Sequence, residues 1–363
     1  MNVDNLHADI IYKIFKHTKG KISPIMKNIL NVREVKQLPK NSDFILRGII
    51  SKFTRRIDRN NNPFWEMTIS DSSGDLDGKA WYVSTWWNTQ AGDKFPIDPD
   101  NCGLRFEGAS VEIEGRIAEF REQMQYNFNS LYYLDQTDYP PHMFSRHSPV
   151  KAETLEDTFR NLIAEVKRED LRRFLEAVFF TSGLWEKFKV WPAAVTLHHA
   201  YAGGLLEHSV SVALGAKHIA QHYPDFAIPV DMDLVIAGSL LHDIGKTEAY
   251  STAPIPLMTT KGNIIEHITL GYNMLMRHSE SQHLSEDLTL ALGHILLSHH
   301  GSREFGSPVL PETPEAMIVR AADDLDFKLS YWKYQIDALN PDSEFTDYLP
   351  LIDRRLWRGI SQQ

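Results

Sequence analysis

Histidine and aspartate residues recur at intervals in the second half of the chain, each beside apolar residues. An ionised aspartate is costly to bury unless it is paired or bound to a metal ion. Imidazole and carboxylate groups together suit Mn²⁺, Fe²⁺, Co²⁺, Ni²⁺ or Zn²⁺. One such histidine alone is usually a packing or surface residue, but the ordered set predicts a metal site. The set is His208, His242-Asp243, His267, His299-His300 and Asp323.

The pair His242-Asp243 follows two leucines and precedes Gly245, which we expect to end a helix. A carboxylate such as Asp243 can bridge two metal ions. Two ions could activate a water and hold the attacking and leaving oxygens of an in-line displacement at phosphorus. This chemistry needs no nucleophilic side chain. The pattern therefore predicts a site for divalent ions that activate water, with Mn²⁺ first among the candidates and Co²⁺, Fe²⁺, Ni²⁺ or Zn²⁺ as alternatives.

Two cations near these ligands are candidates for contacting a scissile phosphate. Lys246 follows the His-Asp pair, although a lysine is equally favoured at a helix C-terminus by the helix dipole. Arg303 follows His299-His300 closely. The pair His198-His199 is left undecided, and surface or packing roles are expected for His218, His222, His278, His283 and His294.

Composition limits the class of protein. The chain has 363 residues, enough for two domains, with 42% hydrophobic and 24% charged residues as in soluble globular proteins. Cys102 is the single cysteine, which excludes disulfide scaffolds and cysteine-based zinc sites and fits a reducing cytoplasm. The sequence shows neither an apolar run of membrane-spanning length nor a secretory signal, so we expect a cytoplasmic protein. A net charge of −10 argues against a nonspecific polycation but allows a local basic groove.

The first half of the chain has the pattern of short strands. Strands are expected at residues 44–50, 64–69, 78–82, 110–120 and 123–131, with turns at 71–74 and 121–122. An irregular segment separates the third strand from the fourth. This arrangement indicates an all-β OB-fold barrel.

The period of the apolar residues changes to about 3.6 after a break at residues 139–142. Helices are expected around residues 155–166, 171–178, 205–223, 233–244, 264–278, 287–300 and 314–334. The predicted organisation is a segment of unclear role at 1–35, an OB-fold nucleic-acid-binding domain at 36–138, a linker at 139–152, an all-α metal-dependent phosphodiesterase domain at 153–340 and a C-terminal segment at 341–363.

Cations and aromatic residues of the first domain could bind a nucleic-acid strand. The loop after the first strand of an OB fold often touches nucleic acid, and aromatic rings can stack on bases. Many of the aromatic residues must instead form the barrel core. The candidate nucleic-acid contacts are Lys52, Arg55, Arg56, Arg59, Trp65 and Trp81.

Three stretches resemble a known family. Residues 198–208 (HHAYAGGLLEH) and 298–309 (SHHGSREFGSPV) are similar to signature stretches of the YhaM-type 3′-5′ exoribonucleases, which belong to the HD-domain superfamily. Residues 322–328 (ADDLDFK) resemble the last motif of that family. An OB fold precedes the HD domain in this family too. The resemblance covers about residues 40–335.

The resemblance implies roles for the predicted ligands. One metal ion would be held by His208, His242, Asp243 and Asp323, and a second by His267, His299 and the shared Asp243. His300 would be a further ligand or a catalytic contact. Arg320 stands where a histidine is expected three residues before the aspartate, so the surroundings of Asp323 should differ from the family pattern.

The expected function is a metal-dependent hydrolytic 3′-5′ exonuclease on single-stranded RNA, with single-stranded DNA as a further substrate and nucleoside 5′-monophosphates as products. One alternative is an HD phosphohydrolase of small nucleotides or cyclic dinucleotides, although the Gly-Tyr-Pro motif of the cyclic-dinucleotide branch is missing after His300. Another is a non-catalytic nucleic-acid-binding protein, against which the intact ligand set argues. The expected partner is single-stranded nucleic acid and not a membrane, and the sequence leaves a homo-oligomer open.

Overall fold

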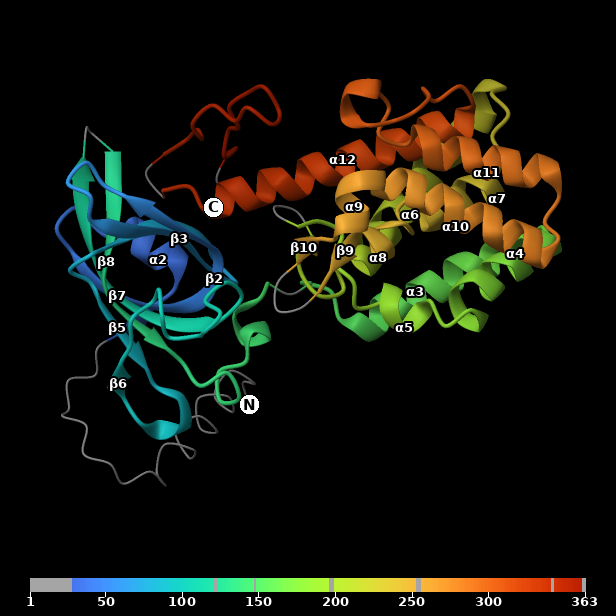
Figure 1. Cartoon of the computed structure of the whole chain (residues 1–363). Coiled ribbons are helices and arrows are strands. Elements are labelled where there is room, and N and C mark those ends of the chain that lie inside the picture. The colour runs from blue at the N-terminus through green and yellow to red at the C-terminus, as the bar shows by residue number, and fades with distance from the viewer. Residues whose placement is uncertain are drawn as a thin grey trace, which may run out of the picture.

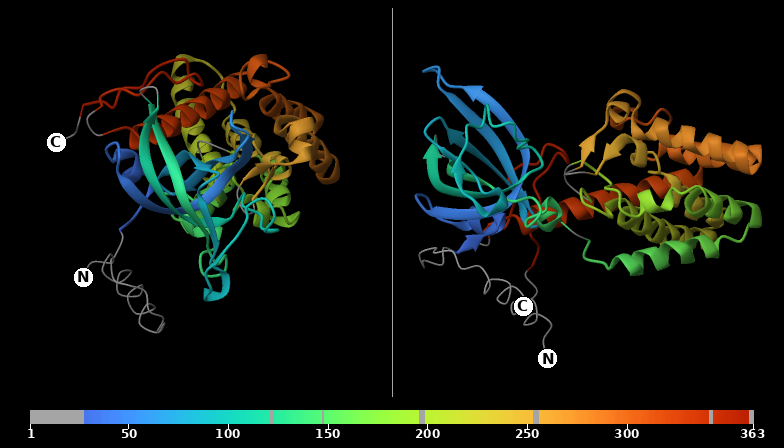
Figure 2. Two further views of the ribbon diagram at one scale, coloured as in Figure 1. Left: turned by 60° about the vertical axis from the view of Figure 1, so that its left-hand side comes forward. Right: turned by 60° about the horizontal axis from the view of Figure 1, so that its bottom comes forward.

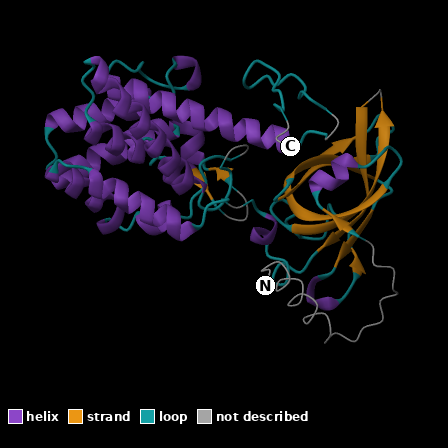
Figure 3. Cartoon of the chain, turned by 180° about the vertical axis from the view of Figure 1, so that it is seen from behind, coloured by secondary structure: helices purple, strands orange, loops and turns teal. Residues whose placement is uncertain are grey.

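The chain folds into a β-barrel followed by a helical domain. The computed structural model describes residues 28–120, 123–146, 148–195, 199–252, 256–340 and 343–360. Strands gather at one end of the molecule and helices at the other, as Figures 1 and 3 show. The predicted order of a β-barrel followed by a helical domain is confirmed.

The barrel is closed in the order β2-β3-β4-β8-β7-β2. Neighbouring strands are antiparallel except β4 and β8, which pair in parallel at Gly78 and Tyr126. This order is that of an OB fold. The strands are β2 (Asp43–Ile57), β3 (Pro63–Asp71), β4 (Gly74–Trp81), β7 (Ser110–Phe120) and β8 (Gln123–Tyr133). The expected turn at 121–122 lies outside the described residues.

Short elements that the strand pattern did not predict complete the barrel. Asn31 caps α2 through a capping box with Glu34, and the helix buries Val32 and Val35 in the barrel core. The expected domain boundary at residue 36 falls inside this helix, so we propose that the barrel unit includes β1. These elements are β1 (Ile29–Leu30), α2 (Val32–Gln37), β5 (Thr85–Asn88), η2 (Gln90–Gly92), β6 (Phe95–Pro96) and η3 (Pro141–Phe144).

The helical domain is built around α6 and α7. The two helices pack against each other, and nearly every residue of α7 is buried. The helices are α3 (Ala152–Glu165), α4 (Glu169–Glu176), α5 (Trp185–Phe188), α6 (Gly204–His222), α7 (Met232–Leu241), α8 (Lys246–Ala249), α9 (Thr260–Ile265), α10 (His267–Gln282), α11 (Glu286–Ser298) and α12 (Pro314–Asp337). Shorter elements are η4 (Ala177–Thr181), η5 (Tyr223–Phe226), β9 (Tyr250–Ser251), β10 (Leu257–Met258) and η6 (Arg303–Phe305).

The predicted helix at 264–278 is divided in the structure. Glu266 has a positive φ of 72°, which ends α9, and its side chain accepts a hydrogen bond from the backbone N–H of Ile268 to cap α10. The break places His267 at the first position of α10. A conformation that the apolar pattern does not encode therefore positions one of the predicted ligands.

Helix α12 extends from the helical domain to the barrel (Figure 2). Asp75 at the start of β4 accepts hydrogen bonds from the Tyr334 hydroxyl at 2.9 Å and from Arg146 at 3.3 Å. The Arg146 guanidinium also lies 4.4 Å from the centre of the Tyr334 ring. A polar contact thus joins barrel, linker and α12. Within the described ranges, the structure contains no helix that is long and apolar enough to cross a membrane.

Candidate metal centre and nucleic-acid interface

The first group of predicted ligands converges between α6, α7 and α12. His208 Nε2 lies 3.2 Å from Asp243 Oδ2 and 3.2 Å from Asp323 Oδ1. His242 Nε2 lies 3.2 Å from both Asp243 Oδ2 and His208 Nε2. Three of the four side chains are about 1% exposed or less, and Asp323 is about 15% exposed. These four side chains are close enough to hold one divalent ion together.

The second group faces the other oxygen of the same aspartate. Asp243 Oδ1 lies 3.3 Å from His267 Nε2 and 3.6 Å from His299 Nε2. One ring nitrogen of each of His267, His299 and His300 lies within 4.8 Å of those of the other two. Asp243 therefore stands between two sets of ligand atoms, with one oxygen toward each.

Hydrogen bonds at Nδ1 leave Nε2 of each of these histidines for a metal ion. Nδ1 of His208 donates to Asp326 at 2.8 Å, and that of His267 donates to Glu266. The remaining Nδ1 donors bind the backbone carbonyls of Ser239 (His242, 2.7 Å), Leu296 (His299, 2.8 Å) and Phe305 (His300, 2.7 Å). Metal-ligating histidines almost always use their second nitrogen in this way.

Buried ligand atoms without hydrogen bonds test whether a second ion fits. Asp243 Oδ1, His267 Nε2 and His299 Nε2 are buried and make no hydrogen bond with the described residues. Leaving such groups unpaired is unfavourable, and a bound cation would satisfy all three at once. The donor set therefore fits a divalent ion at the second group as well as at the first.

The electrostatics of the site favour cations. Burial opposes the ionised form of Asp243, but Lys246 and His242 outweigh it and hold the pKa of this carboxyl well below its usual range. Burial also opposes charge on His208, yet Asp243, Asp323 and Asp326 raise its pKa well above the ordinary value. Burial, together with His299 and His267, lowers the pKa of His300 to about 4, which keeps this ring neutral for ligation.

Lys246 and Gly245 complete the turn after α7. Lys246 is buried, and its Nζ donates to Asp243 Oδ2 at 2.5 Å. Gly245 does not end the helix as expected, because α7 ends at Leu241 and Gly245 has an ordinary φ of −66°. A Cβ at Gly245 would lie 2.0 Å from the His267 carbonyl oxygen. The glycine is needed for the close approach of this turn to α10.

A cavity of ≈ 540 Å³ opens over the ligands. Lys246 and His300 line it, and their contact with a substrate stays a prediction. Arg303 is exposed on η6 and is not among the lining residues. Arg320 lines the cavity instead, lies against Gly301 and makes no ion pair with the part of the chain that is described. Its position one helical turn before Asp323 could have suggested this role.

Asp326, for which the sequence indicated no role, and His199, whose role it left undecided, lie directly behind the first group of ligands. Asp326 accepts hydrogen bonds from His208 and, at 3.2 Å, from His199 Nε2. His199 also lies 2.9 Å from the hydroxyl of Tyr201, which donates to Glu207. The spacing of three residues between Asp323 and Asp326 puts both carboxylates on one face of α12 and was the available signal.

The predicted nucleic-acid contacts of the barrel fall into two classes. Arg55 and Arg56 are about half exposed and pair with Asp100 and Glu66, while Lys52 and Arg59 are exposed. Trp81 is partly buried and stacks on Phe64 with ring centres 5.1 Å apart.

The stacking role predicted for Trp65 is wrong. This side chain is 5% exposed and packs edge-on against Trp86 in the barrel core. The reason is the alternation along β3, which turns Trp65, Met67 and Ile69 inward together. Its ring has no face available to a base.

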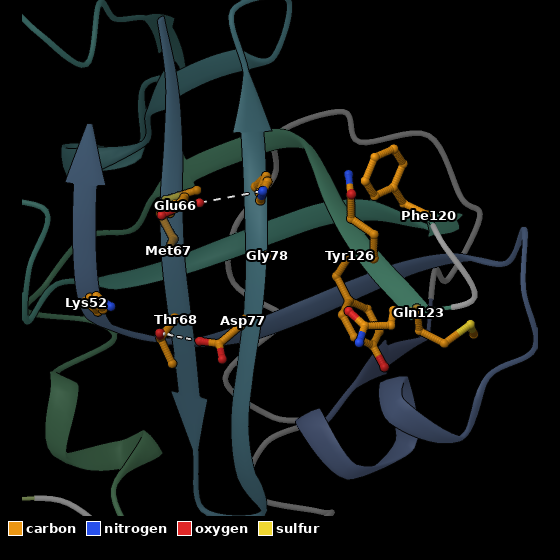
Figure 4. A pocket seen from close by; sticks show the side chains of 12 residues that line it. Lys52, Glu66, Met67, Thr68, Asp77, Gly78, Phe120, Gln123 and Tyr126 are labelled. Carbon is orange, nitrogen blue, oxygen red and sulfur yellow. Dashed lines mark hydrogen bonds and ion pairs between the residues drawn. The ribbon is translucent and has the colours of Figure 1, made fainter. Parts of the chain in front are cut away.

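A hollow on the barrel surface is bordered by β3, β4 and β8 (Figure 4). Lys52 and Lys79 line it together with Glu66 and Asp77, and Tyr126 forms part of its wall. A second cavity of ≈ 580 Å³ shares Lys52, Thr68 and Asp77 with this hollow and reaches Val195 and Ala200 of the helical domain. The barrel face used by OB folds is thus connected to the helical domain.

Comparison with known proteins agrees with this architecture. Residues 205–328 match the family described as HD domain. The chain is 28% identical over 308 residues to the 3′-5′ exoribonuclease YhaM of Bacillus subtilis, covering 85% of this chain and 91% of that protein. It is 27% identical over 314 residues to the protein of the same name from Halalkalibacterium halodurans, covering 85% of this chain and 90% of the other.

A solved structure, the second OB-fold domain of replication protein A from Methanococcus maripaludis, aligns with 29% of this chain and 95% of its own at 11% identity and a TM-score of 0.19. The OB-fold assignment rests on the strand order of the barrel rather than on this likeness. The resemblance inferred from the motifs is confirmed: residues 205–328 match the HD domain, and the chain is similar along most of its length to proteins named 3′-5′ exoribonuclease YhaM.

Proposed function

We propose that this protein is a metal-dependent 3′-5′ exoribonuclease that shortens single-stranded RNA and releases nucleoside 5′-monophosphates. The observation that carries the proposal is the placement of Asp243, whose two oxygens face two adjoining sets of ligand atoms. The similarity to proteins named 3′-5′ exoribonuclease supports the polarity and the substrate. We also propose two ions, Mn²⁺ first among the candidates, and a cytoplasmic setting.

The reaction is hydrolysis of the last phosphodiester of the strand. Water attacks the phosphorus, and the bond from phosphorus to the 3′-oxygen of the penultimate nucleotide breaks. The leaving oxygen takes a proton, so the shortened strand ends in a 3′-hydroxyl and the cycle can repeat. When bound, the metal ions would activate the water and neutralise charge on the phosphate. No step uses the 2′-hydroxyl, so single-stranded DNA should also be cut.

The residues of the chain hold and orient these groups. Asp243 joins the two ligand sets, and the Nδ1 hydrogen bonds keep the histidine rings in place. Lys246 and Arg320 line the cavity and are the cations that we assign to the scissile phosphate. Arginine suits this role because its planar guanidinium can bind two phosphate oxygens. We assign to Arg320 the phosphate contact that was predicted for Arg303, because Arg303 does not line the cavity.

A labelled strand tests the proposal. A single-stranded RNA with a 5′ label, incubated with the protein and Mn²⁺, should give a ladder that descends by one nucleotide from full length. Nucleoside 5′-monophosphates should appear, and a blunt duplex should resist. Internal fragments at early times, or 3′-monophosphate products, would contradict the assignment.

Asp243→Ala is the informative variant for the same assay. It should abolish cleavage while circular dichroism shows a folded protein, and bound metal per chain should fall. Asp157→Ala, which removes an exposed carboxylate from α3, is the matched control and should behave as the natural chain. Near-normal cleavage by Asp243→Ala at saturating Mn²⁺ would exclude the two-ion arrangement.

A further inference from the structure

We infer that the C-terminal hairpin, residues 343–360, is the element that makes this site specific for strand ends. It forms a wall of the metal-site cavity, so a strand can place its last nucleotide over the ligands but cannot pass through. The inference rests on the proposed function, because it concerns which phosphodiester the same site can reach.

The C-terminal hairpin has paired arms and lies beside the C-terminal half of α12 (red loop in Figure 1). Its two arms pair at Phe345 with Trp357 and at Leu349 with Arg354. The buried Thr346 exchanges hydrogen bonds with Leu356, whose N–H reaches the threonine hydroxyl at 3.0 Å. These contacts hold the two arms together.

Specific hydrogen bonds attach the base of the C-terminal hairpin to α12 and its end. The Trp332 indole N–H donates to the Trp357 carbonyl at 3.1 Å. The Arg358 guanidinium donates to the carbonyls of Leu339 at 3.2 Å and Asn340 at 2.6 Å. From this anchor the hairpin runs back along α12, in the direction of the metal ligands.

The tip of the C-terminal hairpin reaches the metal-site cavity. Residues 351–354 line it together with His208, His267 and His299. The tip is braced by the Leu349 N–H, which donates to the Arg354 carbonyl at 2.9 Å, and by the Arg354 Nε, which donates to the Ile352 carbonyl at 2.9 Å. A segment far from the HD motifs in the sequence therefore shapes the space above the ligands.

The position of the tip limits what can lie over the ligands. Cleavage inside a strand requires room for nucleotides on both sides of the scissile phosphate. The cavity of ≈ 540 Å³ is within the size range of sites for one small ligand. On one side its lining continues through Ala193 and Ala194 toward Val195, which borders the cavity between barrel and helical domain. If the strand enters from there, the hairpin tip, which also lines the cavity, blocks its continuation over the ligands.

Two exposed apolar side chains at the cavity fit this arrangement. Phe305 is 69% exposed and Leu351 of the hairpin tip is 52% exposed, and both line the cavity. A terminal base between them would cover apolar surface that now faces water, and the Phe305 ring offers a stacking face. The same contacts favour the end of a strand over an internal nucleotide, because only a terminal base is free to turn into the cavity.

A circular substrate tests the inference. The full chain should shorten linear single-stranded RNA and leave a circle of the same sequence intact. A variant that lacks residues 341–363 retains every metal ligand and should cut the circle, at a rate within about tenfold of its rate on the linear strand. Failure of the full chain on linear RNA would refute the proposed function itself. An intact circle with the shortened variant, while linear RNA is still degraded, would refute only the inference, even if the linear rate rose.

A second variant covers the case in which the shortened chain does not fold. Leu351→Gly, Ile352→Gly and Arg354→Gly together remove three side chains from the cavity wall but leave the anchoring contacts of Trp357 and Arg358 in place. This variant should also cut the circle. Ile360→Ala is the matched control, because Ile360 lies in the same hairpin, is 86% exposed and does not line the cavity. Equal resistance of the circle to the triple variant and the control would overturn the inference.

Discussion

At the scale of single residues, the metal centre depends on the groups behind the ligands. Asp326 is largely buried and accepts hydrogen bonds from His208, His199 and Ser211. Burial opposes its charge, but His199 and His208 outweigh burial and lower the pKa of this carboxyl. Asp326 therefore keeps the His208 ring with Nε2 directed at the other ligands.

Asp326→Asn should weaken metal binding without removing a ligand. Loss of the charge behind His208 should lower the affinity for Mn²⁺ by roughly 10–100-fold, as is typical for such partners. Isothermal titration calorimetry with Mn²⁺ measures the change. Asp337→Asn is the control, since Asp337 pairs with the exposed Lys333 farther along the same helix and does not line the cavity. Equal affinities in the two variants would remove Asp326 from the metal centre.

Arg320 should act on phosphate binding rather than on the metal ions. Its guanidinium lines the cavity with no ion pair in the described part of the chain. Arg320→Gln should raise KM and lower kcat/KM by roughly 10–100-fold, which corresponds to the loss of a charge-assisted hydrogen bond of about 1.5–3 kcal/mol. Steady-state kinetics on a short RNA gives both constants.

Arg320→Lys should recover part of this loss, because it restores the charge but not the planar donor pair. Arg303→Gln, on the exposed η6, should leave the constants nearly unchanged. If the Arg303 variant were the more impaired of the two, the original sequence-based assignment would be right.

At the scale of elements, β2 carries three of the cations predicted to bind nucleic acid, Lys52, Arg55 and Arg56. Arg55 and Arg56 extend from the outer half of this long strand and are each held by a carboxylate, Asp100 and Glu66. A polyanion can compete for such half-exposed pairs, which are weak in water. Strand β2 thus presents arginines that can exchange their carboxylate partners for phosphates of a nucleic acid.

Changing Arg55 and Arg56 together to Ala should raise KM for long RNA and leave kcat nearly constant, because these contacts act equally on substrate and transition state. The slope of log binding constant against log salt should become shallower by up to about 1.4, for two lost contacts to a single strand. Binding titrations over a range of salt concentrations measure it. Arg116→Ala, on β7 beside Asp43, is the control and should not change the slope. An unaltered slope in the double variant would exclude this edge of the barrel from the interface.

At the scale of the whole molecule, the barrel and helical domain meet at a few polar contacts. Asp75 joins them through Tyr334 and Arg146, and Arg33 lies 3.6 Å from Asp337 at the end of α12. Removing residues 1–140 should therefore weaken binding of long strands far more than hydrolysis of a dinucleotide.

Asp75→Ala tests the orientation of the barrel and should give a smaller effect of the same kind. Loss of exposed pairs worth about 0.2–1 kcal/mol should raise KM for long RNA by roughly two- to fivefold. The rate on a dinucleotide should stay constant, and comparing the two substrates in one assay separates the effects. Equal losses on both substrates would mean that the barrel supports the active site itself.

The fold class of each half of the chain and the residue types of the metal ligands could be predicted from the sequence alone. The alternation of apolar and polar residues in 44–134 and the 3.6-residue apolar period after Lys151 come from the need to bury apolar side chains. Both patterns can therefore be recognised without a structure. The histidine and aspartate set can be recognised for a related reason. Polar groups buried among apolar residues require a partner, and metal ions are the common partner of these donor atoms.

Which side-chain atoms contact one another became clear only from the tertiary structure. Rotation of one side chain gives Asp243 an oxygen for each ligand set, and the hydrogen bond from His208 identifies Asp326. Inward alternation on β3 places Trp65 in the core, and packing brings Arg320 rather than Arg303 into the cavity. The C-terminal hairpin enters that cavity from beyond the recognisable motifs. These outcomes depend on contacts between residues far apart in the chain, and neither the local period nor residue type encodes them.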